Sequence, residues 1–198
     1  MPSQSHKRRI ILASSSPYRR TLLERLGLPF TTHSPAIDEE PRSNEPPEQL
    51  VRRLAREKAD EVARRFPDAV VIGSDQIALC AGRILGKPGT PDRARHQLRA
   101  FSGQTVSFLS ALAVRCGADD FLDERTVATE ARFRHLTEDE IRRYVERDQP
   151  ADCAGGFKSE ETGITLLEAL ISEDPTAIIG LPLIALSHAL RQAGFEVP

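Results

Sequence analysis

Serines and arginines surround the start of an expected helix near the N-terminus, in the sequence Ser14-Ser15-Ser16-Pro17-Tyr18-Arg19-Arg20. The first turn of a helix presents unpaired N–H groups and the positive end of the helix dipole, so acidic residues are usual there and arginines are not. Hydroxyls, backbone donors and an arginine at a helix start are suited to a phosphate group. Ser14, Ser16 and Arg19 are therefore candidate phosphate ligands; a serine N-cap with solvated arginines is the alternative.

A lysine occupies the apolar face of a second expected helix. Lys58 lies four residues after Leu54 and four before Val62, so its amine is directed toward the interior or a cleft. A buried ammonium needs an anionic partner, which makes Lys58 a second candidate. The alternative is a snorkelling lysine, whose stem is buried while its charge reaches water.

Carboxylates occur in two separate segments. Asp75 is expected at the end of the apolar strand 69–72, where α/β folds bind their ligands and where a carboxylate can bind a metal or accept a proton from water. A turn-capping aspartate is the alternative. The triplet Asp38-Glu39-Glu40 supplies a second acidic cluster, and two carboxylates from separate segments suit Mg²⁺ when substrate phosphates complete its shell. Solvated surface is the ordinary interpretation of such a triplet.

A further cation, Lys87, lies between Gly86 and Pro88 in a stiff loop. Together these residues provide cations for phosphates and carboxylates for a metal, while the five histidines and three cysteines form no nucleophile dyad. The residue types predict metal-assisted handling of a phosphorylated small molecule.

Hydrophobic patterning places these residues on a mixed series of strands and helices, so the expected class is α/β. Strands 105–116 and 125–133 are expected to pair antiparallel, and 77–85 to form a hairpin. The remaining expected strands are 9–13, 30–34, 69–73 and 164–170, and the expected helices are 18–26, 48–66, 91–101, 137–145 and 182–193.

The composition is that of a globular protein. The chain has 198 residues, 39% of them hydrophobic and 28% charged, which fits a single domain over 1–198. No apolar stretch is long enough for a membrane span or a signal-peptide core, so we expect a cytoplasmic protein. A net charge of −2 provides no electrostatic footprint for a polynucleotide or an anionic membrane, and three widely spaced cysteines predict neither disulfides nor a zinc site.

At these same residues the sequence resembles the Maf family of nucleoside triphosphate pyrophosphatases, and the resemblance covers nearly the whole chain. It implies an elongated mixed β-sheet with flanking helices, two lobes around a central cleft, a relationship to inosine triphosphatase-like enzymes, and a possible homodimer. It also implies divalent-metal-dependent hydrolysis of a nucleotide to its monophosphate and pyrophosphate. The segments that carry the resemblance are 12–14, 16–20, 38–39, 54–59, 72–76, 86–88 and 180–183.

Within this family the sequence looks most like the branch acting on 7-methyl-GTP, because of Tyr18, Gln76 and Glu160. The dTTP/UTP branch typically has Arg, Thr and Gln at these positions. The ring of 7-methylguanine is positively charged, so an aromatic face at Tyr18 can stack on it, and Glu160 can accept from the guanine N1–H and exocyclic amine together. The branch usually places Trp where Tyr18 stands, so the stacking area here is smaller.

The resemblance also implies roles for the individual residues. Asp75 would be the general base, with Glu39 and Asp75 holding the metal cation (Mg²⁺, Mn²⁺ or Co²⁺). The phosphates would be held by Ser14, Ser16, Arg19, Lys58 and Lys87. The competing hypotheses are a pyrophosphatase for dTTP/UTP or a broad set of modified nucleotides, and a nucleotide-sensing regulator of septum formation.

Overall fold

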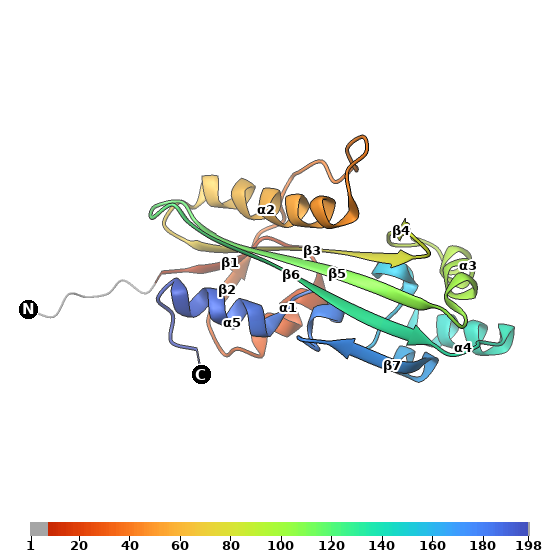
Figure 1. Cartoon of the computed structure of the whole chain (residues 1–198). Helices are drawn as coiled ribbons and strands as arrows, with labels where there is room; N and C mark the ends of the chain where they lie inside the picture. The colour runs from red at the N-terminus through yellow and green to blue at the C-terminus, as the bar shows by residue number, and fades with distance from the viewer. Residues whose placement is uncertain (1–7, 198) are drawn as a thin grey trace, which may run out of the picture.

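The computed structural model describes residues 8–197. The strands form one mixed sheet, and helices cover both of its faces (Figure 1). The sheet has seven strands in the order β2-β1-β3-β5-β6-β7, with β4 paired to β3. The strands are β1 (Ile10–Leu12), β2 (Phe30–Thr32), β3 (Val70–Cys80), β4 (Arg83–Leu85), β5 (Thr105–Cys116), β6 (Phe121–Phe133) and β7 (Leu167–Ser172). The α-helices are α1 (Pro17–Glu24), α2 (Pro47–Arg65), α3 (Pro91–Phe101), α4 (Glu138–Asp148) and α5 (Leu183–Gln192), and the 3₁₀ turns are η1 (Pro150–Asp152), η2 (Ala154–Gly156), η3 (Thr162–Leu166) and η4 (Ala177–Ile179).

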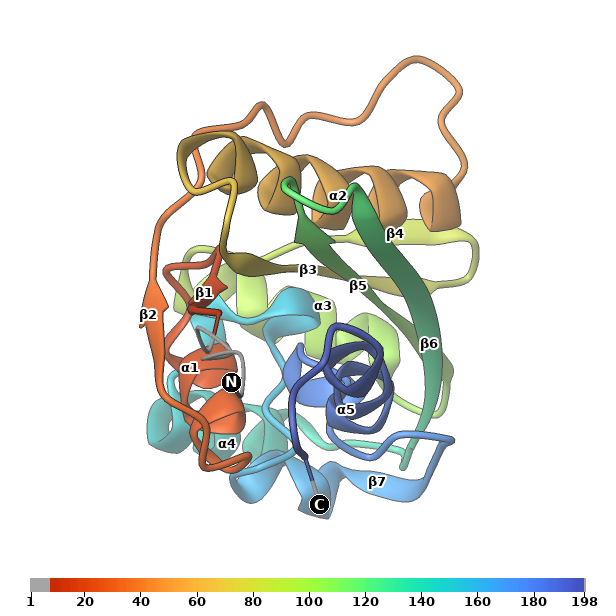
Figure 2. The same cartoon turned by 90° about the vertical axis from the view of Figure 1, so that its left-hand side faces the viewer.

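The helices are distributed over the two faces and one end of an elongated sheet. Helix α2 lies along one face, α1 and α5 lie on the other, and α3 and α4 gather at the end that carries β4 (Figure 1 and Figure 2). The core is divided in the same way, into one apolar cluster under α2, one under α1 and α5, and one around α3 and α4. The expected α/β class and elongated sheet are confirmed. None of the helices within residues 8–197 is long and apolar enough to cross a membrane.

The long strand β3 has a gap in its pairing on one edge. It pairs in parallel with β1 as far as Ile72, and antiparallel with β4 only from Ala78 onward. Among the strands of the described chain, residues 73–77 therefore have a ladder partner only on their other edge, in β5. This gap, which we call the β3 notch, separates the β1–β2 lobe from the lobe of β4, α3 and α4.

Gly73 allows α2 to lie directly against β3. A Cβ atom at this position would lie 2.7 Å from the backbone nitrogen of Ala59, which is closer than real Cβ atoms come to other atoms. Because successive strand residues point to opposite faces, Gly73, Asp75 and Ile77 face α2, while Ser74 and Gln76 face the α5 side. The close contact at Gly73 thus brings the middle of α2 near Asp75.

Some expected boundaries were wrong. Strand β3 continues without a break to Cys80, so Asp75 lies inside the strand and not beyond its end. The strand expected at 125–133 starts earlier, because β6 already begins at Phe121. The strand expected at 164–170 starts later, because 162–166 forms the turn η3 before β7 begins at Leu167. The long pairing of β3, β5 and β6 extends strands past the polar residues that were expected to end them.

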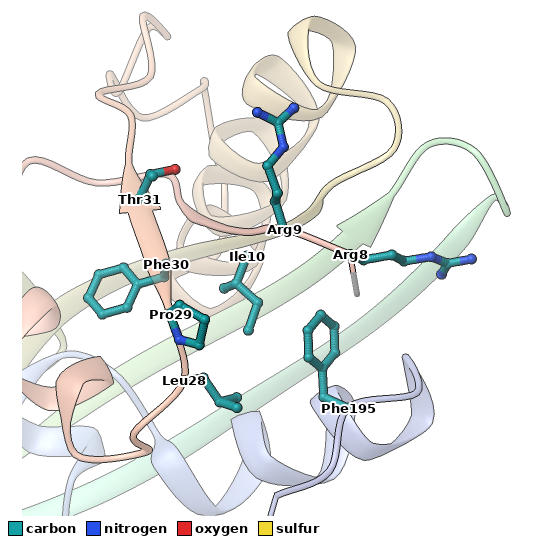
Figure 3. A pocket seen from close by; sticks show the side chains of 8 residues that line it. All are labelled: Arg8, Arg9, Ile10, Leu28, Pro29, Phe30, Thr31 and Phe195. Carbon is teal, nitrogen blue, oxygen red and sulfur yellow. The ribbon is translucent and has the colours of Figure 1, made fainter. Parts of the chain in front are cut away.

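A separate hollow lies at the N-terminal ends of β1 and β2. It is a cavity of about 220 Å³ bounded by β1, β2 and the C-terminal segment at Phe195. Figure 3 shows that the side chains of Ile10, Leu28 and Phe195 lie around it, while the guanidinium groups of Arg8 and Arg9 point away. Its lining contains no carboxylate, so it lacks the groups needed for the predicted chemistry.

Replacing Gly73 with Ala should push α2 away from β3, because there is no free space between them for the added methyl group. We expect Gly73→Ala to lower the free energy of unfolding by about 2 to 3 kcal/mol, measured by urea denaturation. Gly117→Ala is the matched control, since the nearest atom to its Cβ, in Pro67, would be 3.5 Å away at ordinary contact distance. Equal stability of the two variants would contradict the close approach of α2.

Candidate functional site

A cleft of about 550 Å³ opens over the β3 notch. Its walls come from the β1–α1 connection, from α2 and the segment preceding it, and from the loop after β4. These segments meet because α1 begins at the end of β1, while β3 continues past that end to reach β4. The predicted residues that line the cleft are Ser14, Ser16, Tyr18, Arg19, Glu39, Lys58, Asp75, Gln76 and Lys87.

An ammonium group bridges two carboxylates at the floor of the cleft. Lys58 Nζ lies 2.7 Å from Asp75 Oδ1 and 2.9 Å from Glu39 Oε1. The side chains of Lys58 and Asp75 are 7% and 10% exposed, whereas that of Glu39 is 60% exposed. The lysine therefore does not snorkel to bulk solvent, and its partners come from β3 and from the loop before α2. Asp75 lies inside β3 and does not cap a turn, so the alternative interpretation of this residue as a turn-capping aspartate is wrong.

The loop that carries Glu39 is fastened to α2. Asp38 Oδ1 accepts a hydrogen bond from the Glu40 backbone nitrogen at 3.0 Å, and Arg53 donates to the Glu40 carbonyl oxygen at 3.1 Å. Arg53 also donates twice to the carboxylate of Glu45, and these bonds lower the pKa of Glu45 to about 2. Of the acidic triplet 38–40, only Glu39 lines the cleft.

Carbonyl oxygens of the segment 177–180 fix the side chains on the other face of β3. The hydroxyl of Ser74 lies 2.8 Å from the carbonyl oxygens of both Ala111 and Gly180, and the amide nitrogen of Gln76 donates to Ala177 and Ile178 at 3.0 and 2.8 Å. Gly180 has a φ of 113°, which turns the chain at this point. Gln76 is thus held through its nitrogen, and any contact it makes with a ligand falls to its Oε1 atom.

Arg19 connects this segment to the helix start. Its Nε donates to the Gly180 carbonyl oxygen at 2.9 Å, and its Nη1 lies 3.5 Å from Ser14 Oγ. Ser16 is the N-cap of α1 and accepts from the Arg19 backbone nitrogen, as the alternative interpretation of this segment expects. Burial lowers the pKa of Arg19, and the carboxylates of Asp75 and Glu39 oppose that effect. A cation is therefore held beside the first turn of α1, next to the carboxylates.

A smaller pocket adjoins the cleft and contains the residues predicted to read the base. It shares Tyr18, Gln76 and Lys87 with the cleft and adds Phe157 and Glu160. Burial raises the pKa of the Glu160 carboxyl. Burial, with Cys153 and Asp152 nearby, also raises the pKa of Tyr18, so its hydroxyl stays protonated at neutral pH. The three residues expected from separate segments do converge on one pocket.

Two residues of this region were not predicted. Asp152 accepts hydrogen bonds from the Tyr18 hydroxyl, and Lys158 Nζ lies 5.3 Å from the centroid of the Tyr18 ring. Both lie between the expected helix 137–145 and the expected strand 164–170, where strand or helix periodicity gives no signal for the direction of a side chain. The juxtaposition of 18 with 152 and 158 is a tertiary contact that no local pattern encodes.

The carboxylates fit a divalent cation only in part. Asp75 and Glu39 both approach one point, which Lys58 Nζ occupies, and carboxylate oxygens are the ligands that Mg²⁺ and Mn²⁺ prefer. Within residues 8–197, no three or more His, Cys, Asp and Glu side chains are grouped so that they could hold a metal ion. A cation at this point would therefore need oxygens from the substrate to complete its shell.

Comparison with known proteins identifies the family. The model of the family described as Maf-like protein matches residues 9–193, and the chain belongs to this family. It is 55% identical over 190 residues to the 7-methyl-GTP pyrophosphatase of Xanthomonas axonopodis pv. citri, covering 96% of this chain and 99% of that protein. It is 52% identical over 189 residues to the protein of the same name from Pseudomonas aeruginosa, covering 96% and 98%, and 52% identical over 190 residues to that from Aromatoleum aromaticum, again covering 96% and 98%.

Replacing Lys58 with Met should leave the Asp75 carboxylate without its cation in a nearly closed site. We expect Lys58→Met to lower the free energy of unfolding by about 3 kcal/mol, because an uncompensated buried charge costs more than the pair contributes. Urea denaturation at pH 7.5 would measure it. Adding Asp75→Asn to Lys58→Met should restore part of the loss, whereas Lys87→Met, at an exposed lysine, should change stability by less than about 0.5 kcal/mol. A double variant less stable than Lys58→Met would contradict the pairing.

Proposed function

We propose that this protein hydrolyses 7-methyl-GTP to 7-methyl-GMP and pyrophosphate. The observation that carries the proposal is the continuity of the two hollows: the cleft holds Asp75, Glu39 and Lys58, and the adjoining pocket holds Tyr18 and Glu160. The names of the relatives, at 52% to 55% identity over nearly the whole chain, support the same substrate.

The cleft would bind the triphosphate through its cations and the start of α1. Arg19 and Lys58 lie next to the carboxylates, and Lys87 lies in the loop after β4, so positive charge surrounds the space on two sides. Ser14, Ser16 and the backbone N–H groups of the first helical turn add uncharged donors. Positive charge at this place stabilises the negative charge that develops on the leaving pyrophosphate.

Asp75 would act as the general base. A water molecule beside the Asp75 carboxylate would transfer a proton to that carboxylate as the water oxygen bonds to the α-phosphorus. The bond between the α-phosphorus and the oxygen that bridges the α- and β-phosphates would break. The electron pair of that bond leaves with pyrophosphate. Lys58 holds the carboxylate in place through the 2.7 Å contact and neutralises part of the charge in the cleft.

We propose that Glu39 and Asp75 also hold a divalent cation, together with phosphate oxygens. Such a cation would supply electrostatic stabilisation of the transferred phosphoryl group. The partial set of protein ligands fits a cation that enters with the nucleotide, because within residues 8–197 no third His, Cys, Asp or Glu side chain is grouped with these two carboxylates. Glu39, at 60% exposure, can turn away from Lys58 more readily than Asp75 can.

The adjoining pocket would recognise the base through charge and hydrogen bonding. Tyr18 offers an aromatic face to the cationic ring of 7-methylguanine. An ionised Glu160 can accept from N1–H and the exocyclic amine, and Oε1 of Gln76 is a further acceptor. Uracil and thymine present a carbonyl oxygen beside their single ring N–H, which two acceptors do not match. The homodimer and the cytoplasmic location stay predictions from the sequence.

The variant Asp75→Asn should lose turnover, because the amide cannot accept the proton of the attacking water. It should keep nucleotide binding, because Lys58 still has its ion pair with Glu39. We expect a fall of about 10²- to 10⁴-fold in kcat, measured as pyrophosphate release with Mg²⁺ or Mn²⁺. The substrates compared are 7-methyl-GTP, GTP, dTTP, UTP and CTP. Asp68→Asn, at an exposed aspartate outside the cleft, is the control and should match the unaltered protein.

Three outcomes would speak against the proposal in different ways. A lead of dTTP or UTP would overturn the choice of base and leave the reaction standing. Full activity of Asp75→Asn would remove the assigned base. Nucleotide binding without any release of pyrophosphate would favour the sensing regulator.

Glu39→Gln should weaken the use of the divalent cation. We expect the Mg²⁺ concentration for half-maximal activity to rise about tenfold, because one of two charged ligands is lost, and EDTA should abolish activity of the unaltered protein. Titration of activity against Mg²⁺ at fixed 7-methyl-GTP measures both. Glu40→Gln, next to Glu39 but outside the cleft lining, is the matched control, and an identical titration for both variants would refute a role for Glu39.

A further inference from the structure

Tyr18 lines the smaller pocket beside the cleft, which also holds Gln76 and Glu160 and which we call the base pocket. The Tyr18 side chain is restrained at two points. The Tyr18 hydroxyl lies 3.0 and 3.2 Å from the two carboxylate oxygens of Asp152, and Lys158 Nζ lies 5.3 Å from the ring centroid. Asp152 belongs to η1 and Lys158 to the segment after η2, so both restraints come from the part of the chain that follows α4.

Lys158 is itself held by the backbone around it. Its Nζ donates to the Asp148 carbonyl oxygen at 2.8 Å, and its backbone nitrogen donates to the Tyr144 hydroxyl at 2.8 Å. Both partners belong to α4. The ammonium over the Tyr18 ring is therefore part of a fixed arrangement and does not depend on a ligand.

The two ring faces of Tyr18 have different surroundings. Tyr18 and Asp152 line the base pocket and also an open hollow next to it. Of these two hollows, Lys158 lines only the open one, whereas Gln76 and Glu160 line only the base pocket. These linings place the ammonium on the side of the open hollow, and Gln76 and Glu160 on the side of the base pocket.

We propose that Asp152 is a positioning residue for base recognition, holding the Tyr18 ring through its hydroxyl as one wall of the pocket. The inference rests on the proposed function, because it assumes a base that stacks on Tyr18. A tyrosine has less stacking surface than a tryptophan, so its contact with a base depends more on a fixed ring orientation.

The test is a double-variant cycle measured by binding and not by turnover. We would determine the Kd of 7-methyl-GMP by calorimetry for the unaltered protein, Asp152→Ala, Tyr18→Phe and the double variant. Each single variant should raise this Kd about 3- to 10-fold, since each removes the same hydrogen bond. The double variant should bind as weakly as either single variant and no more weakly, because the two changes act on one interaction.

Two further measurements separate positioning from other roles. Asp152→Asn keeps an acceptor for the hydroxyl and should restore affinity to within about twofold of the unaltered protein. The Kd of pyrophosphate, which lacks a base, should stay unchanged in Asp152→Ala, whereas a general loosening of the site would raise it. Additive effects in the cycle, or Asp152→Asn as weak as Asp152→Ala, would overturn the inference in favour of a direct charge contact with the base.

The outcomes for the inference and for the proposed function are distinguishable. A protein that binds 7-methyl-GMP with the expected cycle but releases no pyrophosphate retains the inference and loses the proposed reaction. A protein that hydrolyses 7-methyl-GTP with an unchanged Kd in Asp152→Ala retains the reaction and loses the inference. Failure of the unaltered protein to bind 7-methyl-GMP would overturn the inference, whereas the proposed reaction would still be decided by the release of pyrophosphate from 7-methyl-GTP.

Discussion

The pairing of Lys58 with Asp75 across the contact between α2 and β3 is the interaction on which the site depends. The amine comes from the middle of a helix whose buried face is mostly apolar, and the carboxylate comes from the middle of a central strand. Neither group can be buried alone without a large desolvation cost, so the helix and the strand are stabilised in one relative position. Gly73 makes that position possible, because any side chain there would meet the backbone of α2.

The alternation of β3 divides the work of the site between two faces. Asp75 faces α2, where the charged groups gather, and its neighbour Gln76 is bonded to carbonyl oxygens on the α5 side. One residue along a strand thus separates the group assigned to the reaction from a group assigned to the base. The segment 177–180 holds Ser74, Gln76 and Arg19 together, so a shift of this segment would move parts of both regions.

Most elements follow from local patterns in the sequence, and the exceptions have physical causes. The helices expected from 18 and 137 begin within one residue of those positions, at Pro17 and Glu138, where Ser16 and Thr137 are the N-caps, because caps are local interactions. The length of β3 was underestimated, because its polar residues Ser74, Asp75 and Gln76 are stabilised by α2, β5 and the segment 177–180, which are distant in sequence. Asp152 was missed for the same reason: its partner Tyr18 is 134 residues away in the chain. The prediction that the candidate residues form one site came from the family resemblance. The structure adds which side chains each of them contacts.

The β3 notch also bears on the behaviour of the protein toward other chains. An unpaired strand edge is a template for a foreign strand, and proteins commonly protect such edges against aggregation. Here the free edge spans only residues 73–77, roughly 16 Å, and it is bounded at both ends by β1 and β4. An extended polypeptide would collide with these strands before it formed a useful ladder, whereas a compact small molecule fits between them. The β3 notch is therefore wide enough for a small molecule but too short for pairing with a strand of another sheet.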